Sequence, residues 1–134
     1  MSFPTLTALY AAVLSLMFAA LSIWVVAGRG QFRIHHGDGG KEAMNRRIRA
    51  HGNFAEYVPL ILLLAAFLEG AGAGHRMIHA LLAPLVAARL MHPIGMLARE
   101  GSLQQFAFRG VAALATFVIL TTAAVLLLLR LLSA

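Results

Sequence analysis

The apolar positions of the chain fall into four long stretches, and the first and last of these contain no charged residue. The first runs from Ser2 to Gly28 and the last from Gly110 to Leu129. A helix needs about 20 mostly apolar residues to cross the roughly 30 Å hydrocarbon core of a bilayer, because each residue adds about 1.5 Å. Both stretches are long enough, so the pattern predicts two membrane-spanning helices without ionisable groups.

The two middle stretches are shorter, so ionisable residues must lie inside the helices that they predict. Only 12 residues separate Glu56 from Glu69, and only 12 separate Arg76 from Arg89. A crossing helix must therefore begin before Glu56 in one case and continue past Arg89 in the other. We expect spans over about residues 4–27, 50–68, 76–98 and 106–130, with Glu69 at the outer rim.

Composition supports a membrane protein. Of the 134 residues, 60% are hydrophobic and 12% are charged, against about 25% charged in an ordinary soluble domain. We predict an all-α integral membrane fold in which residues 1–134 form a single domain, a four-transmembrane-helix bundle. The lack of cysteine excludes a disulfide scaffold. The formal charge of +6 does not indicate a nucleic-acid partner, because the basic residues form no stripe interleaved with aromatics.

Basic residues are concentrated in two of the three expected connections. The third connection holds Arg99, and the first, from about Arg29 to Ile48, holds Arg29, Arg33, Lys41, Arg46 and Arg47. Connections rich in lysine and arginine face the cytoplasm in most membrane proteins. Because the first and third connections share one side of a four-span chain, we expect both termini to lie outside the cytoplasm.

Polar residues of the second and third spans repeat at helical spacing. The two sets are Arg46, Arg49, Asn53 and Glu56, and Arg89, His92, Met96 and Arg99. Steps of 3, 4 and 3 residues place each set on one face of its helix. Glu56 lies 7 residues past Arg49 and His92 lies 7 residues before Arg99, so both sit about 10 Å inward from the same side. We expect the two faces to meet.

The charges inside the expected spans do not balance. Arg49, Arg89 and Arg109 are cations, whereas Glu56 is the single acid among them. Charged residues in a span usually face the protein interior and find a partner there. The excess of cations therefore indicates a site for an anion. An alternative is that Arg49 and Arg109 extend to lipid headgroups and that only Arg89 is buried, against Glu56.

The histidines leave another alternative open. His51 and His92 could hold a haem between helices, in a haem-binding or proton-carrying membrane subunit. His51 lies off the helix face that carries Arg49, which disfavours this pair. The loop histidines His35 and His36 have no carboxylates or thiolates at ligand spacing beside them, so no metal site is expected.

Residues 45–60, with the sequence NRRIRAHGNFAEYVPL, resemble the signature helix of the MAPEG family, membrane-associated proteins in eicosanoid and glutathione metabolism. The stretch follows the pattern R-x-H-x-N-x-x-E-[YT]-x-P. The resemblance covers essentially the whole chain, through GDGG at residues 37–40, Ala88-Arg89 with His92 and Gly95, and Arg109-Gly110. The bacterial branch fits better than the mammalian prostaglandin and leukotriene synthases, which implies a bacterial inner membrane.

The resemblance implies a homotrimer that holds glutathione between adjacent subunits, near the cytoplasmic side. Family members use the arginine, asparagine and glutamate of the signature helix to hold the charged ends of the tripeptide. In this chain these residues are Arg49, Asn53 and Glu56, and the following tyrosine, Tyr57, lies nearby. Glutathione has two carboxylates and an ammonium group, so it suits both the surplus arginines and Glu56.

Further residues complete the glutathione site that the resemblance implies. Arg29 or Arg33, late in the first span, reaches in from a neighbouring subunit. Arg89 and His92 are expected to contact glutathione from the third span. Arg109, at the start of the fourth span, is the residue credited with activating the thiol, and the choice between Arg109 and Arg89 for that contact stays open.

The predicted activity is that of a glutathione-dependent transferase or peroxidase acting on lipophilic electrophiles or lipids in the membrane. Lowering the pKa of a free thiol from about 8.5 to about 6.5 needs about 2.7 kcal/mol. One guanidinium about 4 Å away offers up to roughly 4 kcal/mol at an effective dielectric constant near 20. The alternative is a non-catalytic lipid- or thiol-binding membrane module that supports a partner protein. This alternative rests on a difference from the catalytic mammalian members. They carry tyrosines late in span three, where this chain has Met96 and no tyrosine.

Overall fold

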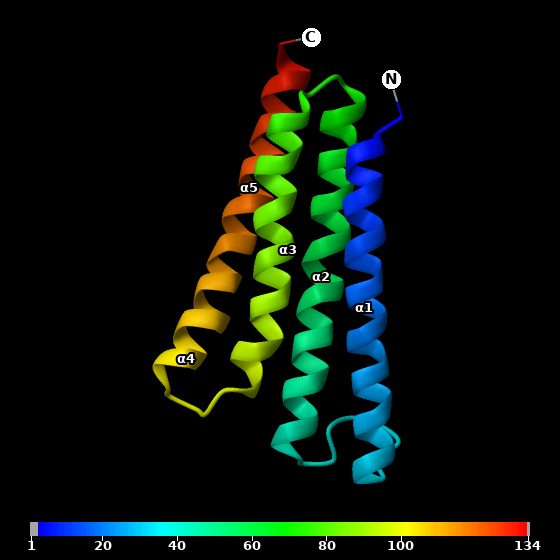
Figure 1. Cartoon of the computed structure of the whole chain (residues 1–134), viewed down its shortest axis with the longest axis vertical. Coiled ribbons are helices and arrows are strands. Elements are labelled where there is room, and N and C mark those ends of the chain that lie inside the picture. Colours follow the sequence, from blue (N-terminus) through cyan, green and yellow to red (C-terminus); the bar gives the residue numbers. More distant parts are fainter. Residues whose placement is uncertain (1–2, 134) are drawn as a thin grey trace.

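Four long helices make up the structure, a computed structural model that describes residues 3–133 (Figure 1). The helices are α1 (Thr5–Phe32), α2 (Glu42–Gly70), α3 (His75–Leu97) and a last helix that joins α4 (Leu103–Gln105), the π-helical segment η1 (Phe106–Gly110) and α5 (Val111–Leu132). All four are long and apolar enough to cross a membrane. The prediction of an all-helical chain with four candidate spans is therefore confirmed.

Neighbouring helices run in opposite directions, so both termini lie at the same end of the bundle (Figure 1). The α1–α2 loop and the α3–α4 connection lie at the opposite end, which we call the basic end because both carry arginines. α2 packs against α1, α3 and α5. This central position lets α2 contribute to any site between the other helices.

The loop at the basic end is shorter than the expected one from Arg29 to Ile48. α1 continues to Phe32 and α2 begins at Glu42, so only residues 33–41 connect them. The expected loop was too long because charged residues do not end a helix. Arginine, glutamate, alanine and methionine are all good helix formers, so both helices continue beyond their apolar stretches.

The loop itself begins where the backbone leaves the helical region. Arg33 adopts the left-handed conformation with φ of 53°. Gly37, Gly39 and Gly40 follow with positive φ, a region that glycine enters without steric cost. As a result Arg29 lies in α1. Arg46 and Arg47, which were expected in the second half of the loop, lie in α2.

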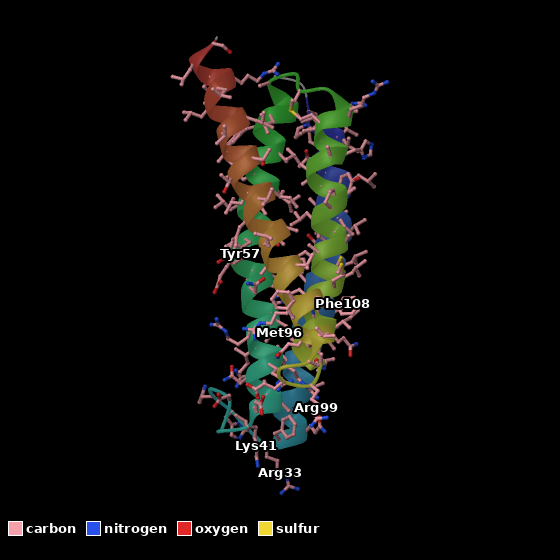
Figure 2. All side chains as sticks on the ribbon, turned by 90° about the vertical axis from the view of Figure 1, so that its left-hand side faces the viewer. Arg33, Lys41, Tyr57, Met96, Arg99 and Phe108 are labelled. Atoms are coloured by element: carbon pink, nitrogen blue, oxygen red, sulfur yellow. The ribbon has the colours of Figure 1, made fainter. Side chains whose placement is uncertain are left out.

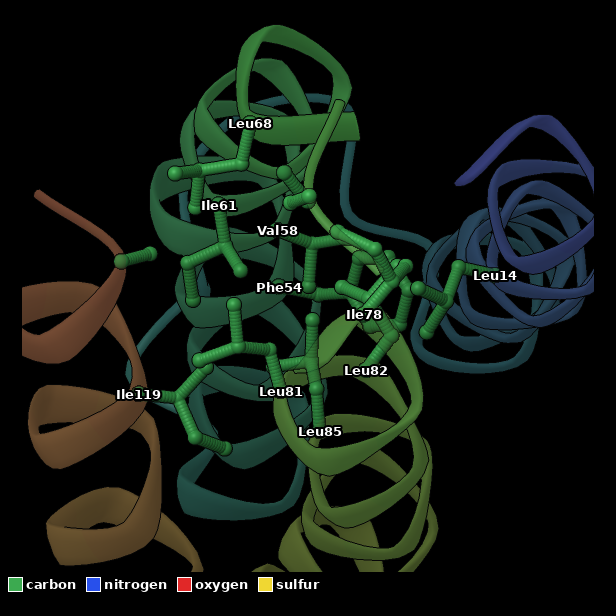
Figure 3. Close-up of a cluster of buried hydrophobic side chains, with 13 residues drawn as sticks. Leu14, Phe54, Val58, Ile61, Leu68, Ile78, Leu81, Leu82, Leu85 and Ile119 are labelled. Atoms are coloured by element: carbon green, nitrogen blue, oxygen red, sulfur yellow. The ribbon is translucent and has the colours of Figure 1, made fainter. Parts of the chain in front are cut away.

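The hydrophobic core lies in the half of the bundle nearer the termini, and Figure 3 shows its side chains packed between the helices. On α2 its members are Phe54, Val58, Ile61, Ala65 and Leu68. Their steps of 4, 3, 4 and 3 residues form one apolar face of the helix. Leucines and isoleucines of α1, α3 and α5 pack against this face. Because apolar side chains fill this half, the polar faces that carry Arg49, Asn53 and Glu56 on α2 and His92 on α3 lie toward the basic end.

Glu69, expected at the outer rim, lies in the last turn of α2 but has a buried side chain, only 6% exposed. Its carboxylate accepts hydrogen bonds from the backbone nitrogens of Leu6 (2.9 Å) and Thr7 (2.7 Å) and from the hydroxyl of Thr7 (2.6 Å). The first N–H groups of a helix have no partner within it, and a negative charge there is favoured by the helix dipole. Glu69 therefore caps α1 and fastens it to α2.

We expect Glu69→Gln to destabilise the bundle by about 1–3 kcal/mol, because the neutral amide loses the charge and turns a donor toward the N–H groups of α1. Thermal unfolding in detergent, followed by circular dichroism, measures the change. Glu100→Gln is the control, since Glu100 is exposed. Equal unfolding temperatures for the two variants would show that the cap does not stabilise the fold.

Candidate functional site

A pocket of about 310 Å³ lies toward the basic end, between α2, α3 and the last helix. It is lined by Ile48, Arg49, Gly52, Asn53, Glu56, His92, Met96, Arg109 and Ala113. Figure 2 shows Met96 at a height between Tyr57, midway along the bundle, and Arg99, closer to the basic end. The pocket therefore occupies the half of the bundle that the hydrophobic core leaves to polar residues.

The structure brings five of the expected site residues together in this pocket. They are Arg49, Asn53, Glu56, His92 and Arg109. The three from α2 follow one another at steps of 4 and 3 residues, so they share one face of the helix. Glu56 and His92 line the same pocket, so the polar faces of α2 and α3 meet as their spacing predicts.

The charged groups of the pocket have no protein partner in the described part of the chain. Within residues 3–133, no hydrogen bond or ion pair involves the side chain of Arg49, Glu56 or Arg109, and all three are exposed. Within the described range, the one ion pair joins Arg46 to Glu42. Two guanidinium groups against one carboxylate leave a net positive charge facing the pocket.

Arg89 lies behind the pocket wall and does not line the pocket. It is 2% exposed, its Nη1 donates a hydrogen bond to Oδ1 of Asn53 at 2.6 Å, and its Nη2 donates to the hydroxyl of Thr116. The partners of this buried arginine are therefore neutral groups of α2 and α5, and Glu56 is not among them. Oδ1 of Asn53 already accepts from Arg89, and the amide nitrogen of Asn53 remains as a donor for a ligand.

Arg109 lies within the π-helical segment η1, in direct backbone contact with α3. A Cβ atom at Gly95 would lie 2.9 Å from the carbonyl carbon of Phe108 and 3.0 Å from Cα of Arg109, and closer still to the backbone nitrogen of Arg109. Only glycine leaves room for this approach. π-helical segments are rare and occur frequently at functional sites. Gly95 and the π segment together place Arg109 at the pocket, and the spacing of polar residues gave no signal for either.

Gly52, like Gly95, was not assigned to the site by the sequence analysis. It faces the pocket from α2, and a Cβ atom there would meet only the Glu56 carboxylate, at 4.0 Å. The lack of a side chain therefore adds open space beside Asn53 and Glu56. Its position one residue before Asn53 was the available signal.

A second polar pocket, of about 260 Å³, continues toward the basic end. It shares Arg49, Met96 and Arg109 with the first pocket and is also lined by Glu42, Asn45, Arg46, Glu100 and Gln105. Arg46 closes one side, because its Nη1 donates to the carbonyl oxygen of Ala98 at 2.8 Å at the end of α3. The two pockets together form a polar path that ends at the connection between α3 and α4.

Arg29, Arg33 and Tyr57 do not line either polar pocket of this single chain. Arg29 donates hydrogen bonds to two carbonyl oxygens of the α1–α2 loop, at 3.2 and 3.1 Å. Arg33 is exposed at the end of α1. Tyr57 packs edge-on against Phe117 of α5, with ring centroids 5.4 Å apart.

His51 and His92 lie on different sides of α2. His51 stacks on Phe18 of α1, with ring centroids 4.6 Å apart, and its Nε2 lies 3.1 Å from the hydroxyl of Ser22. His92 lines the polar pocket between α2, α3 and the last helix. The structure therefore does not bring the two histidines together around a common space, as a haem between them would require.

Comparison with known proteins identifies the family of this chain. Residues 7–129 match the model of the MAPEG family. The chain is 42% identical over 89 residues to inner membrane protein YecN of Escherichia coli strain K12, an alignment that covers 66% of this chain and 68% of that protein. The YecN protein of Escherichia coli O6:H1 strain CFT073 gives the same values. No solved structure matches the chain. With four candidate spans, these findings support a multi-pass inner membrane protein, and the chain belongs to the MAPEG family.

Proposed function

We propose that the polar pocket binds glutathione and that the protein is a glutathione-dependent transferase or peroxidase acting on lipophilic electrophiles. The observation that carries this proposal is the group of Arg49, Glu56 and Arg109, which face one pocket without partners among residues 3–133. Arg49 suits one carboxylate of glutathione and Glu56 suits its ammonium group, which leaves Arg109 for the sulfur. The tripeptide has one net negative charge, which complements the net positive charge of the pocket.

Arg109 has the role of holding the sulfur as a thiolate. A guanidinium about 4 Å from the sulfur offers up to roughly 4 kcal/mol at an effective dielectric constant near 20, enough to favour the thiolate at neutral pH. The thiol proton leaves to water, and the sulfur attacks an electrophilic carbon of the lipophilic substrate. A carbon–sulfur bond forms while the bond to the leaving group breaks, and the leaving group takes the electron pair.

The proposed assembly is a homotrimer in which a neighbouring subunit covers the open side of the pocket. Arg49, Glu56 and Arg109 lie at the surface of the single bundle, so a second chain can reach them. Arg33 is exposed at the end of α1. Either Arg33 or Arg29 is the arginine that a neighbouring subunit would bring to glutathione. The lipophilic substrate would approach from the surrounding lipid.

Isothermal titration of the detergent-solubilised protein with glutathione tests the proposed site. We expect Arg49→Ala and Glu56→Gln each to weaken binding by about 10- to 100-fold, because each removes a hydrogen-bonded charge pair worth about 1.5–3 kcal/mol. Arg99→Ala is the control, since Arg99 is exposed at the same end and lines neither pocket. Binding that all three variants retain equally would contradict the site. Light scattering on the same samples gives the mass, and a monomeric mass would contradict the trimer.

We propose that the basic end faces the cytoplasm and that both termini face the opposite side. The two connections at that end contain Arg33, Lys41 and Arg99, and such residues stay on the cytoplasmic side. A periplasm-active reporter fused to the C-terminus should therefore be active, and a cytoplasm-active reporter should be silent. The reverse result would place the pocket on the periplasmic side.

The second candidate function is a non-catalytic module that binds thiol or lipid and supports a partner protein. The observation in its favour is that no hydroxyl group lines the polar pocket, where Met96 occupies the α3 wall. This function predicts that glutathione binds as above but that no electrophile is conjugated. Turnover that depends on Arg109 would exclude it.

A further inference from the structure

Arg89 is a buried cation with no acidic partner in the described part of the chain. It lies within α3 and is 2% exposed, and the one ion pair within residues 3–133 does not include it. Its side-chain partners are the neutral groups of Asn53 and Thr116. A charge inside a membrane-spanning helix is costly and usually marks a functional site. Because Arg89 does not line the polar pocket, any effect on a ligand beyond its long-range charge passes through one of these partners.

Asn53 connects Arg89 to the polar pocket. Nη1 of Arg89 donates a hydrogen bond to Oδ1 of Asn53 at 2.6 Å, and Asn53 itself lines the pocket. A guanidinium group has donors only, so it binds the oxygen of the amide and not the nitrogen. The contact therefore determines which way round the amide lies.

Nδ2 of Asn53 is accessible and has no protein partner. The contact with Arg89 is the one side-chain hydrogen bond of Asn53 within residues 3–133. In the same part of the chain, Nε of Arg89 is the one buried side-chain nitrogen or oxygen without a partner, so the unpaired Nδ2 of Asn53 has accessible surface. Arg49 lies one helical turn before Asn53 and lines the same pocket. A guanidinium and an amide donor on one helix face suit the acceptor oxygens of a carboxylate.

We propose that Arg89 is a positioning residue for the glutathione pocket, which holds the Asn53 amide so that Nδ2 donates to an acceptor oxygen of glutathione. Without this contact, a buried Oδ1 has no partner, and the amide turns to place the oxygen in the pocket. An oxygen there repels a carboxylate and attracts the ammonium group that Glu56 is proposed to bind. Arg89 therefore sets the direction in which glutathione lies. The role rests on the proposed glutathione site and adds a residue that does not touch the ligand.

Isothermal titration with glutathione, combined with thermal unfolding in detergent, tests this role. Arg89→Met replaces the guanidinium by an apolar side chain, and we expect it to weaken glutathione binding by about 10- to 100-fold because Oδ1 loses its donor. Arg89→Lys keeps the charge, and an ammonium group also has donors only, but it cannot contact Asn53 and Thr116 as the forked guanidinium does. We expect an intermediate loss of about 3- to 10-fold.

A double-mutant cycle with Asn53→Ala separates positioning from a loss of charge or of stability. If Arg89 acts through Asn53, either Arg89 variant should cost less than about threefold further once Asn53 is alanine. Glu69→Gln is the stability control, because its cap lies at the opposite end of the bundle from the pocket. It should lower the unfolding temperature and keep the wild-type affinity. The cycle can be completed with Arg89→Lys alone if Arg89→Met does not fold.

Four results would count against the proposal. Affinity within about threefold of wild type in both Arg89 variants would remove the role of Arg89. Losses that add in the double variants would assign the effect to charge and not to Asn53. A similar loss of affinity in Glu69→Gln would assign it to stability. A wild-type protein that does not bind glutathione would overturn the proposed function and, with it, this role, whereas the first three results leave the proposed function standing.

Discussion

Conjugation of glutathione to an aryl halide is expected to slow by about 100- to 1,000-fold in Arg109→Ala, which is the usual loss when one preorganised stabilising group is removed from a developing or existing anion. Arg109 is exposed to the pocket, and within residues 3–133 it has no other partner to occupy it. The expected loss is therefore mainly in kcat, with a smaller change in glutathione affinity. Steady-state rates in detergent, and the ultraviolet absorbance of bound thiolate, measure the two effects.

Two further variants make the result for Arg109 specific. Arg109→Lys keeps the charge but loses the planar fork of donors, so it should recover part of the rate. Arg99→Ala removes a cation from the same end and should keep the full rate. Equal background rates in the wild-type protein, Arg109→Ala and Arg99→Ala would end the case for an enzyme and leave the binding module.

The second large effect is expected at Gly95, where the backbone of η1 lies against α3. In Gly95→Ala the new methyl group would collide with the backbone of Phe108 and Arg109, which cannot rotate away as a side chain can. We expect the π-helical segment to move and activity to fall about 100-fold, because a displacement of about 1 Å can cost that much. The same collision should lower stability by about 1–3 kcal/mol.

Gly30→Ala is the matched control for this substitution. Gly30 also lies in a helix, but a Cβ atom there meets nothing within 4 Å, so alanine should leave activity unchanged and raise stability slightly. Gly95→Ala with wild-type activity and unfolding temperature would show that η1 can shift without displacing Arg109 from its function.

The helices could be predicted from the sequence because apolar length allows few other solutions in a bilayer. The boundaries could not, because polar residues at the basic end lie outside the apolar pattern and still favour a helix. For this reason α2 begins at Glu42, eight residues before the expected start at Ala50. The cap that Glu69 provides could not be predicted for a related reason: its partners, Leu6 and Thr7, lie on another helix.

The pocket could be predicted in part. Spacing on α2 and depth along α3 are local properties, and they predicted that Glu56 and His92 lie at one level, where both line the pocket. The π-helical segment depends on a backbone contact between two helices that has no periodic signature. The environment of Arg89 depends on Thr116, a polar residue inside an uncharged stretch, whose hydroxyl replaces the acid that the charge count suggested as a partner.

The length of α2 determines where the pocket meets its surroundings. The helix has 29 residues and is therefore about 44 Å long, about 14 Å longer than the hydrocarbon layer. The excess corresponds in length to its polar first turns, so we expect Arg49 to lie at the boundary between water and lipid. A water-soluble peptide and an oil-soluble reactant can then meet at one place while each remains in its own phase.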